Sequence, residues 1–156
     1  PSCILEIGTY TGYGTLCLAE GLSNGGKIFT IDRNEELLKI QNKYFEMSGK
    51  RDKIIQLTGN AKDILENLDE SYDMVFIDAD KENYIEYFNL VSERLNNNGI
   101  IISDNVLWSG KVLNSPSKND EETNILIEFN KTLNEDERFE TIILPIRDGL
   151  SISRLI

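Results

Sequence analysis

Residues 74–81 read MVFIDADK, and this stretch decides the fold. Its first four residues form a continuous apolar run, which is typical of a central strand in a parallel sheet whose two faces are both buried. Acidic residues follow directly after the run. The same order recurs in residues 100–105, which read IIISDN. Two neighbouring strands are therefore expected to carry oxygen-bearing side chains to one edge of a sheet, because parallel strands end at the same edge.

The segments on either side of this stretch alternate in pattern. Short runs rich in β-branched residues are followed by longer amphipathic runs, an order that predicts βαβ units and a parallel sheet. Strands are expected at residues 3–7, 27–31, 53–57, 72–77 and 100–103, and helices at about 13–22, 34–48, 61–68, 82–95 and 120–133, with a loop at 106–119. Asn34 is the expected N-cap of its helix, because a short polar side chain there can accept a hydrogen bond from the first turn.

The end of the chain has a different pattern. Residues 139–144 and 150–155 both read as strands, and the five residues between them, PIRDG, are too few for a crossover helix. The sheet should therefore finish with an antiparallel hairpin. The predicted fold class is α/β, with a mostly parallel seven-stranded sheet, helices on both faces and a single domain over residues 1–156.

The composition limits the classes of protein to which the chain can belong. Its 156 residues suffice for one domain with a substantial core, and 40% hydrophobic with 28% charged residues is ordinary for a globular protein. The net charge of −11 disfavours broad binding to nucleic acid or anionic lipid. No run approaches the roughly 20 apolar residues that a membrane helix needs, and no basic-then-apolar leader opens the sequence, so we expect a cytoplasmic protein.

Two residue types narrow the chemistry further. The sequence contains no histidine, which excludes every mechanism that needs an imidazole, such as a Ser-His-Asp triad, and every zinc site with histidine ligands. Cys3 and Cys17 fall on a predicted strand and a predicted helix, where reduced thiols are expected. Pro1 lies about two residues before the first strand, and we expect that helices preceding this strand are missing from the sequence.

A glycine-rich turn follows the first strand. Its glycines, Gly8, Gly12 and Gly14, have the spacing GxxxGxG, which departs from the GxGxxG fingerprint of NAD and FAD sites. Such a turn lets the backbone approach a ligand closely and opens the N-terminus of a helix. Glu6, near the end of the strand, suits a cationic or amine-bearing ligand better than a pyrophosphate. The alternative for Glu6 is a capping role.

Two further segments flank the same edge. Asp32 follows the second strand, where an acid commonly binds both hydroxyls of a ribose, although a solvated turn residue is the simpler alternative. Residues 59–61, GNA, follow the third strand at a position that would flank an adenine. Together with the glycine-rich turn, these residues predict a site for a nucleotide-like cofactor.

The polar residues after the two central strands fit a metal site. Asp78, Asp104 and Asn105 carry hard oxygen ligands suited to Mg²⁺, Mn²⁺ or Ca²⁺. Three protein ligands leave about three octahedral positions for water or substrate, as in a catalytic site. Asp80 alternates with Asp78 and is expected to point elsewhere. For the Asp-Asn pair the alternative is a plain turn, which both residue types favour.

Lys81 follows the first of these aspartates by three residues. Close to a metal, its ammonium should have a lowered pKa, and the neutral amine can then serve as a general base for a phenolic or similar hydroxyl. An ordinary surface lysine at a helix start is the alternative. Trp108 either walls a substrate pocket or packs in the core, and Tyr84 is expected on the buried face of its helix.

These segments resemble the cation-dependent O-methyltransferase family, which includes catechol and caffeoyl-coenzyme A O-methyltransferases. The resemblance covers nearly the whole chain: LEIGTYTGYG at 5–14, TID at 30–32, GNA at 59–61, DMVFIDADKENY at 73–84, ISDNVLWSGKV at 102–112 and RDGLSISR at 147–154. It implies a Rossmann-like class I fold and the cofactor S-adenosyl-L-methionine. The sequence departs from the family at Gly14, where many relatives have serine, and at Arg147, where glycine is usual.

The resemblance also implies roles for individual residues. The cofactor site would be lined by Glu6, Gly8, Tyr10, Gly14, Asp32, Ala61 and Asp78; the metal would be held by Asp78, Asp104 and Asn105; and Lys81 and Asp78 would be the catalytic residues. In the implied reaction the metal chelates two adjacent substrate oxygens, and Lys81 takes the proton of the one that attacks the methyl carbon of the sulfonium. Holding both reactants in line can be worth about 7–11 kcal/mol.

Three functions remain open on the sequence alone. The leading hypothesis is a homodimeric O-methyltransferase acting on a catechol-like or vicinal-diol hydroxyl of a small molecule. A tRNA wobble 5-hydroxyuridine O-methyltransferase is the second hypothesis, although the acidic charge disfavours it. A module that binds S-adenosylmethionine without catalysis is the third.

Overall fold

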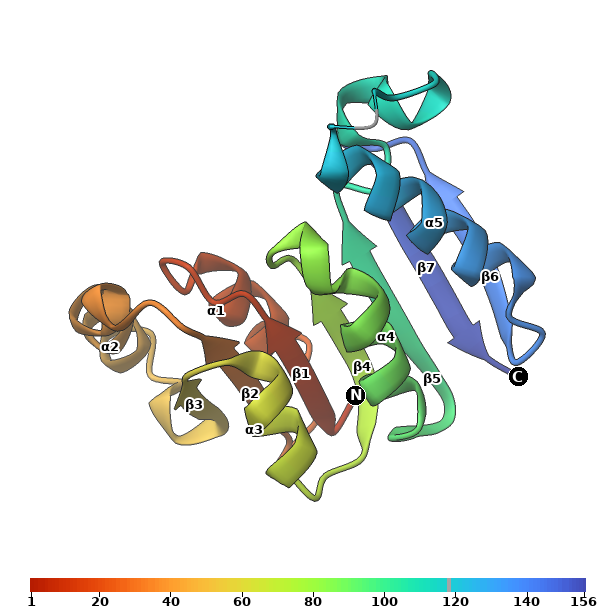
Figure 1. The fold of residues 1–156 in the computed structure, drawn as a ribbon. Coiled ribbons are helices and arrows are strands. Elements are labelled where there is room, and N and C mark those ends of the chain that lie inside the picture. The colour runs from red at the N-terminus through yellow and green to blue at the C-terminus, as the bar shows by residue number, and fades with distance from the viewer. Residues whose placement is uncertain (118) are drawn as a thin grey trace.

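The computed structural model describes residues 1–117 and 119–156, and in these ranges seven strands form a single sheet (Figure 1). Lys118, within the predicted loop 106–119, lies outside the described residues. The strands are β1 (Cys3–Ile7), β2 (Lys27–Asp32), β3 (Ile54–Thr58), β4 (Tyr72–Ile77), β5 (Leu95–Asp104), β6 (Phe139–Leu144) and β7 (Leu150–Leu155). Their order is β3-β2-β1-β4-β5-β7-β6. β1 to β5 run parallel, and β7 is antiparallel to β5 and β6, so the predicted sheet with its terminal hairpin is confirmed.

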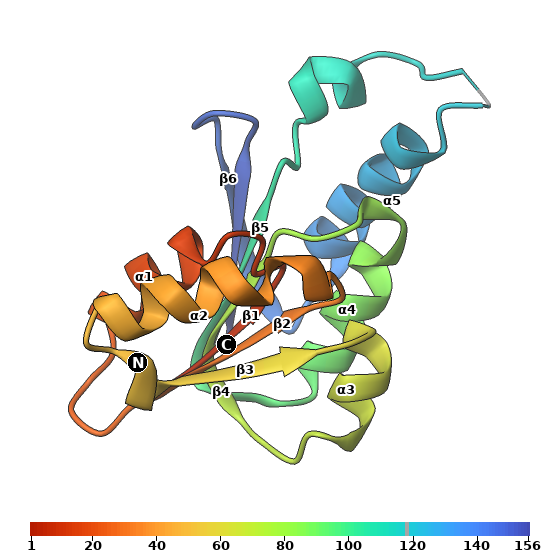
Figure 2. The same cartoon turned by 90° about the vertical axis from the view of Figure 1, so that its left-hand side faces the viewer.

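Helices cover both faces of this sheet. The α-helices are α1 (Tyr13–Glu20), α2 (Leu38–Met47), α3 (Ala61–Asn67), α4 (Tyr84–Ser92) and α5 (Glu121–Glu135). Short 3₁₀ helices are η1 (Glu35–Leu37), η2 (Arg51–Lys53), η3 (Lys81–Asn83) and η4 (Trp108–Leu113). Figure 2 shows α1 and α2 on one side of the sheet and α3, α4 and α5 on the other. The arrangement is the one expected of an α/β fold with two helical layers.

Side chains that alternate along β1 contribute to a core on each face. Ile4 packs with Ile28 and Phe45, whereas Leu5 and Ile7 belong to the larger core on the opposite face. All five side chains are at most 1% exposed. Full burial of an apolar side chain of this size stabilises the fold by about 1.5–3 kcal/mol. The central strand is therefore anchored from both sides, which fixes the position of the turn that follows it.

Two predicted boundaries near residue 95 are wrong. The helix expected over residues 82–95 ends at Ser92, and the strand expected to start at residue 100 already begins at Leu95. The cause is tertiary pairing: Leu95 pairs with Tyr72, and the ladder shifts register before regular pairing with β4 resumes. The asparagine-rich segment expected to stop the helix therefore lies inside β5, because an irregular ladder tolerates residues that weaken a regular strand.

The other predicted boundaries agree with the structure to within two residues, counting the 3₁₀ turns that open α2 and α4 as part of their helices. The predicted N-cap is confirmed, because the side chain of Asn34 accepts a hydrogen bond of 3.0 Å from the backbone N–H of Glu36. Within the predicted loop 106–119, the structure adds the short helix η4.

The register of the sheet brings four strand ends to one edge. Ile7 pairs with both Ile31 and Ile77, and Ile77 pairs with Ser103. The residues that follow these positions therefore lie side by side at the carboxyl edge, which is where open α/β sheets bind ligands.

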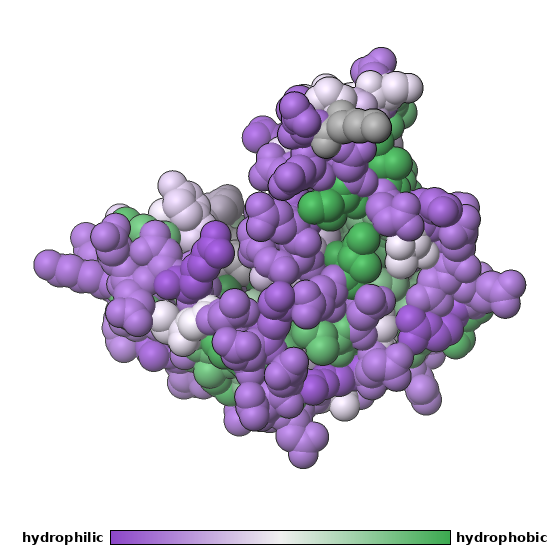
Figure 3. Space-filling model, in the orientation of Figure 1, coloured by the Kyte–Doolittle hydropathy of each residue, from purple (hydrophilic) through white to green (hydrophobic). Residues whose placement is uncertain are grey.

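Figure 3 shows the face of the molecule that carries α3, α4 and α5. Hydrophilic residues cover most of this face, and hydrophobic residues reach the surface between α4 and α5 and beside α3. Among the residues that the structure describes, no helix has the length and apolar character needed to cross a membrane.

Candidate active site

A cavity of about 160 Å³ opens at the carboxyl edge of the sheet. It is lined by Ile7, Gly8, Tyr10, Ile31, Asp32, Arg33, Gly59, Ala61, Asp78, Ala79, Asp80 and Tyr87. The cavity therefore lies where the topology gathers the ends of β1, β2, β3 and β4. Of the residues expected to line a cofactor site, five line this cavity: Gly8, Tyr10, Asp32, Ala61 and Asp78.

Gly8 is the residue that allows the ends of β1 and β4 to meet. Its φ of 106° is in the region that side-chain-bearing residues rarely adopt. A Cβ atom at this position would lie only 1.9 Å from the backbone oxygen of Asp78. The Gly8 N–H donates to the carbonyl of Ile31 at 2.9 Å, and the Asp78 N–H donates to the carbonyl of Ile7 at 2.9 Å. A glycine is thus required here by both conformation and space.

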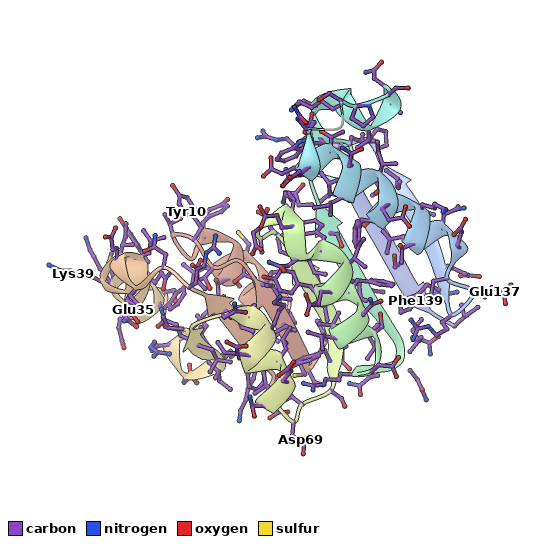
Figure 4. All side chains as sticks on the ribbon, in the orientation of Figure 1. Tyr10, Glu35, Lys39, Asp69, Glu137 and Phe139 are labelled. Carbon is purple, nitrogen blue, oxygen red and sulfur yellow. The ribbon has the colours of Figure 1, made fainter. Side chains whose placement is uncertain are left out.

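Asp32 joins the glycine-rich turn to the end of β2. Its Oδ2 accepts a hydrogen bond of 2.7 Å from the Tyr10 N–H, and its Oδ1 accepts one of 2.8 Å from the Asn34 N–H. Each carboxylate oxygen keeps a further lone pair, since such an oxygen can accept two hydrogen bonds. Figure 4 shows Tyr10 projecting from the turn between β1 and α1, and its side chain is 71% exposed. The fixed carboxylate can therefore accept hydrogen bonds from a ligand with adjacent hydroxyls.

Glu6 and Gly14 are not among the residues that line the cavity. The Glu6 side chain is 1% exposed, and its Oε2 accepts hydrogen bonds from Thr15 Oγ1 at 2.5 Å and Thr30 Oγ1 at 2.6 Å. A Cβ atom on Gly14 would lie 2.7 Å from Glu6 Oε1, so the two residues are neighbours. Burial raises the pKa of the Glu6 carboxyl to about 7, although the two threonine hydroxyls lower it. Direct contact of these two residues with a cofactor stays a prediction.

Lys81 lies beside the predicted metal ligands, in the part of the carboxyl edge that we call the chemical half. Its Nζ donates to Asn105 Oδ1 at 2.9 Å and to the hydroxyl of Tyr84, and it lies 3.6 Å from Asp78 Oδ1. The lysine is only 6% exposed. Burial lowers the pKa of its ammonium, and the nearby carboxylates of Asp78 and Asp104 oppose that shift. The structure thus brings Lys81 together with Asp78 and Asn105, and the charge of Asp104 acts on its ammonium as well.

Asp104 and Asn105, the two expected metal ligands at the end of β5, are held in place by hydrogen bonds to the backbone, one of them from a tyrosine. Asp104 Oδ1 accepts a hydrogen bond of 2.6 Å from the N–H of Asn105, whose φ is 63°. The hydroxyl of Tyr84, a fully buried residue as expected, donates to the carbonyl of Asp104 at 3.1 Å. Burial raises the pKa of the Asp104 carboxyl, and the charge of Asp78 adds to the shift. The two carboxylates are therefore close enough to repel each other.

The chemistry of these donors fits a divalent cation. Among the described residues, no three His, Cys, Asp or Glu side chains lie together as metal ligands. A cation at this edge would therefore use the amide oxygen of Asn105 beside the carboxylates of Asp78 and Asp104. All three are hard oxygen donors, and a dication would offset the repulsion between the two carboxylates. The 46% exposure of the Asp78 side chain leaves it accessible to a ligand from solvent.

Three further polar residues that line the cavity were not predicted from the sequence: Arg33, Asp80 and Tyr87. Asp80 was expected to point elsewhere, yet it lines the same cavity as Asp78. Its Oδ1 accepts a hydrogen bond of 2.9 Å from the Tyr87 hydroxyl, and its Oδ2 accepts one from Asn83. Strand alternation fails as a guide because β4 ends at Ile77 and the chain turns afterwards. Tyr87 lies three residues after Tyr84, which was predicted to be buried. Its helical spacing from Tyr84 was the only sequence feature that could have indicated its position.

The segment after β5 is tied to the turn of the terminal hairpin. The Leu107 N–H donates to the carbonyl of Asp148 at 2.9 Å, and the Val106 N–H donates to that of Gly149 at 3.2 Å. Trp108 follows, with its ring centroid 6.0 Å from Lys81 Nζ. The indole therefore lies beside the chemical half of the edge, where it can either line a substrate pocket or pack against Lys81.

A model of the O-methyltransferase family matches residues 2–156 of the chain. This chain belongs to the O-methyltransferase family. The family expected from the sequence is thereby confirmed. Among curated relatives, caffeoyl-CoA O-methyltransferase 5 of Nicotiana tabacum is 36% identical over 163 residues, covering 97% of this chain and 68% of the relative. Caffeoyl-CoA O-methyltransferase 1 of Eucalyptus globulus is also 36% identical, with 97% and 66% covered. The chain spans about two thirds of the length of these relatives.

Solved O-methyltransferase structures have the same fold. An O-methyltransferase from Bacillus cereus, in complex with SAH, is 30% identical with a TM-score of 0.92, over 99% of this chain and 74% of that one. The O-methyltransferase TomG from Streptomyces achromogenes, in complex with SAM, is 26% identical with a TM-score of 0.91, over 99% and 73%. The Rossmann-like fold of an S-adenosylmethionine-dependent methyltransferase is thus confirmed for this chain.

Proposed function

We propose that the protein containing this chain is an S-adenosylmethionine-dependent O-methyltransferase that requires a divalent cation, Mg²⁺ or else Mn²⁺ or Ca²⁺. The proposed acceptor is a catechol-like or vicinal-diol hydroxyl of a small molecule. One observation carries the proposal: a buried lysine, Lys81, has its Nζ 2.9 Å from Asn105 Oδ1 and 3.6 Å from Asp78 Oδ1. A partly desolvated amine beside hard oxygen ligands is the arrangement needed to deprotonate a hydroxyl next to a bound cation.

The cofactor half of the site would hold the nucleoside of S-adenosylmethionine. Asp32, fixed by two backbone N–H groups, would accept hydrogen bonds from the ribose hydroxyls. Gly8 keeps the backbone beside Asp78 free of a side chain, so that a ligand can approach closely. Ala61, at the start of α3, would contact the base. The related structures with SAM and SAH support this assignment.

The chemical half would activate the acceptor. When bound, S-adenosylmethionine supplies an electrophilic methyl group and the cation supplies a Lewis acid that lowers the pKa of the acceptor hydroxyl. Asp78, Asp104 and Asn105 would hold the cation through their oxygens. Lys81, in its neutral form, accepts the hydroxyl proton at Nζ, and the low exposure of this residue keeps competing water away. The fixed edge of the sheet orients acceptor and cofactor for attack in line.

The small-molecule acceptor is preferred to the two other hypotheses. The relatives described above are named for caffeoyl-CoA, which favours a small acceptor over a tRNA. The position of Lys81 among the proposed metal ligands favours catalysis over cofactor binding alone. The homodimer and the cytoplasmic location expected from the sequence stay predictions, as does the choice of metal.

A chelator experiment tests the proposal. The full-length protein is incubated with S-adenosylmethionine and a panel of catechols, with and without EDTA, and binding of SAH is measured in parallel. We expect methyl transfer to fall on the order of 10²-fold or more with EDTA and to return with added Mg²⁺, while SAH affinity is unchanged. Methylation that is insensitive to EDTA would overturn the metal-dependent mechanism. Absence of SAH binding would overturn the assignment of the cofactor.

A further inference from the structure

Helix α2 presents one buried face to the glycine-rich turn. Its buried residues are Gln41 and Phe45, 1% and 0% exposed, at positions i and i+4 on one side of the helix. A glutamine buried this completely is unusual, because a lost hydrogen bond of its amide costs about 1–3 kcal/mol in the interior. The hydrogen-bond partners of Gln41 therefore indicate the role of α2.

Gln41 holds the peptide of Tyr10. Its Nε2 donates to the Tyr10 carbonyl at 2.6 Å, and its Oε1 accepts a hydrogen bond from Gln56 on β3. The acceptor role of Oε1 leaves the amide nitrogen directed at the turn. On its other side, the Tyr10 N–H donates to Asp32 Oδ2 at 2.7 Å. Both backbone polar groups of Tyr10 are thus bound by side chains from outside the turn.

The backbone of Tyr10 needs this support. Its φ of 46° is uncommon for a residue with an aromatic side chain, and such a conformation persists only where its surroundings impose it. The Tyr10 side chain, 71% exposed, offers little packing to hold the turn. The hydrogen bond that Gln41 donates to Tyr10 and the one that Asp32 accepts from it therefore fix this residue.

Phe45 supports the same turn four residues further along α2. A Cβ atom on Gly12 would lie 2.6 Å from Phe45 Cε1, so the ring packs directly against the backbone of the turn. The face of α2 thus makes one polar and one apolar contact with the segment between β1 and α1. That segment contributes Gly8 and Tyr10 to the cavity.

We infer that Gln41 is a positioning residue for cofactor binding: it holds Tyr10, and through Tyr10 the carboxylate of Asp32, in the geometry that binds the nucleoside. The inference rests on the proposed function, since it concerns the same cavity. It assigns a role to a helix that contributes no residue to the cavity lining. The role differs from that of Lys81, because it acts on cofactor affinity and not on the chemical step.

Gln41→Met tests the inference in the full-length protein. Methionine fills a similar volume but cannot donate to Tyr10, so the turn loses its support while the core stays filled. We expect SAH to bind about tenfold more weakly by calorimetry, as the loss of one buried hydrogen bond predicts. The KM for S-adenosylmethionine should rise by about the same factor, and kcat at saturating cofactor should fall less than about twofold.

A control on the same helix separates positioning from a general loss of stability. Ser48→Ala removes the hydrogen bonds of Ser48 Oγ to the carbonyl of Phe45 and from the N–H of Lys50 at the end of α2, and it leaves both the Gln41–Tyr10 bond and the Phe45 ring in place. SAH affinity should be unchanged in this variant. If Gln41→Met does not fold, Gln56→Met tests the inference instead. This change removes only the hydrogen bond that orients the Gln41 amide, and we expect SAH to bind about threefold more weakly.

The outcomes distinguish this inference from the proposed function. Wild-type affinity in Gln41→Met, or equal losses in Gln41→Met and Ser48→Ala, overturns the inference alone. If Gln41→Met does not fold, wild-type SAH affinity in Gln56→Met overturns the inference alone. Absence of SAH binding by the wild-type protein overturns the proposed function and the inference with it.

Discussion

The two halves of the carboxyl edge are held in different ways. The cofactor half is built from backbone: a glycine with a φ of 106° lies against the carbonyl of Asp78, and Asp32 is fixed by two backbone N–H groups. The chemical half is built from side chains, with Lys81 buried among Asp78, Tyr84 and Asn105.

This difference predicts different sensitivities. Changes in the cofactor half should act through conformation and stability, because the backbone geometry of a turn is part of the fold. Apart from changes of Asp78, which also lines the cofactor cavity, changes in the chemical half should act on the rate with little effect on folding or cofactor binding. Substitutions in each half therefore test whether the two are separable.

The largest expected effect is that of Lys81→Met. Loss of the general base should lower kcat on the order of 10²–10⁴-fold, while SAH affinity stays within about twofold of wild type. Lys62→Met is the matched control, because Lys62 pairs with Glu86 at 3.0 Å and is not among the cavity-lining residues. Steady-state kinetics and calorimetry on the same preparations give both readouts. A Lys81→Met variant that keeps a third of the wild-type kcat would exclude Lys81 as the base.

The pH dependence sharpens the same test. The base acts when neutral, so kcat should rise with pH and level off as Lys81 loses its proton. Because burial lowers the pKa of Lys81, the midpoint of this rise should lie below the ordinary lysine value of about 10.4. The rise should be absent from Lys81→Met. A wild-type profile whose midpoint lies above about pH 10.4 would contradict the lowered pKa.

Gly8→Ala should have the largest effect on stability. The new Cβ would lie 1.9 Å from the Asp78 oxygen and would impose an unfavourable φ, at a cost on the order of 4 kcal/mol. Gly25→Ala is the control: Gly25 has a φ of 76°, but a Cβ atom added there would meet no neighbouring group within 4 Å. That change should cost about 1 kcal/mol. Urea unfolding measures both. Equal losses would show that φ alone, and not the contact with β4, sets the cost.

Glu6→Gln should have the smallest effect, and it should depend on pH. The folded-state pKa of Glu6 is raised to about 7, so its carboxyl contributes stability that is fully present below its unfolded pKa of about 4.3 and is lost as pH rises through the folded value. Between about pH 4 and 8 the wild type should lose at most about 3.5 kcal/mol from this group, since one pKa unit corresponds to about 1.36 kcal/mol. Glu6→Gln should lack this loss. Parallel stability curves for the two proteins would show that Glu6 titrates normally.

The positions of the residues in the chemical half follow more directly from the sequence than those in the cofactor half. Asp78, Asp104, Asn105 and Lys81 follow apolar strands directly, and parallel pairing alone brings such positions to one edge. For the cofactor half, the structure buries Glu6 and binds it to Thr15 and Thr30, and its direct contact with a cofactor stays a prediction. Alternation shows that Glu6 shares a face with Ile4, but it does not show what packs on that face.

By itself, the sequence determined the order of strands and helices, the parallel sheet with its terminal hairpin and the oxygen-rich carboxyl edge. These features follow from local periodicity and from the rule that parallel strands end together. Tertiary structure alone decided the early start of β5, the turn that returns Asp80 to the cavity and the contact of Gln41 with Tyr10. The physical reason is common to all three: each depends on a partner distant in the chain, and no local pattern records which distant residue packs against it.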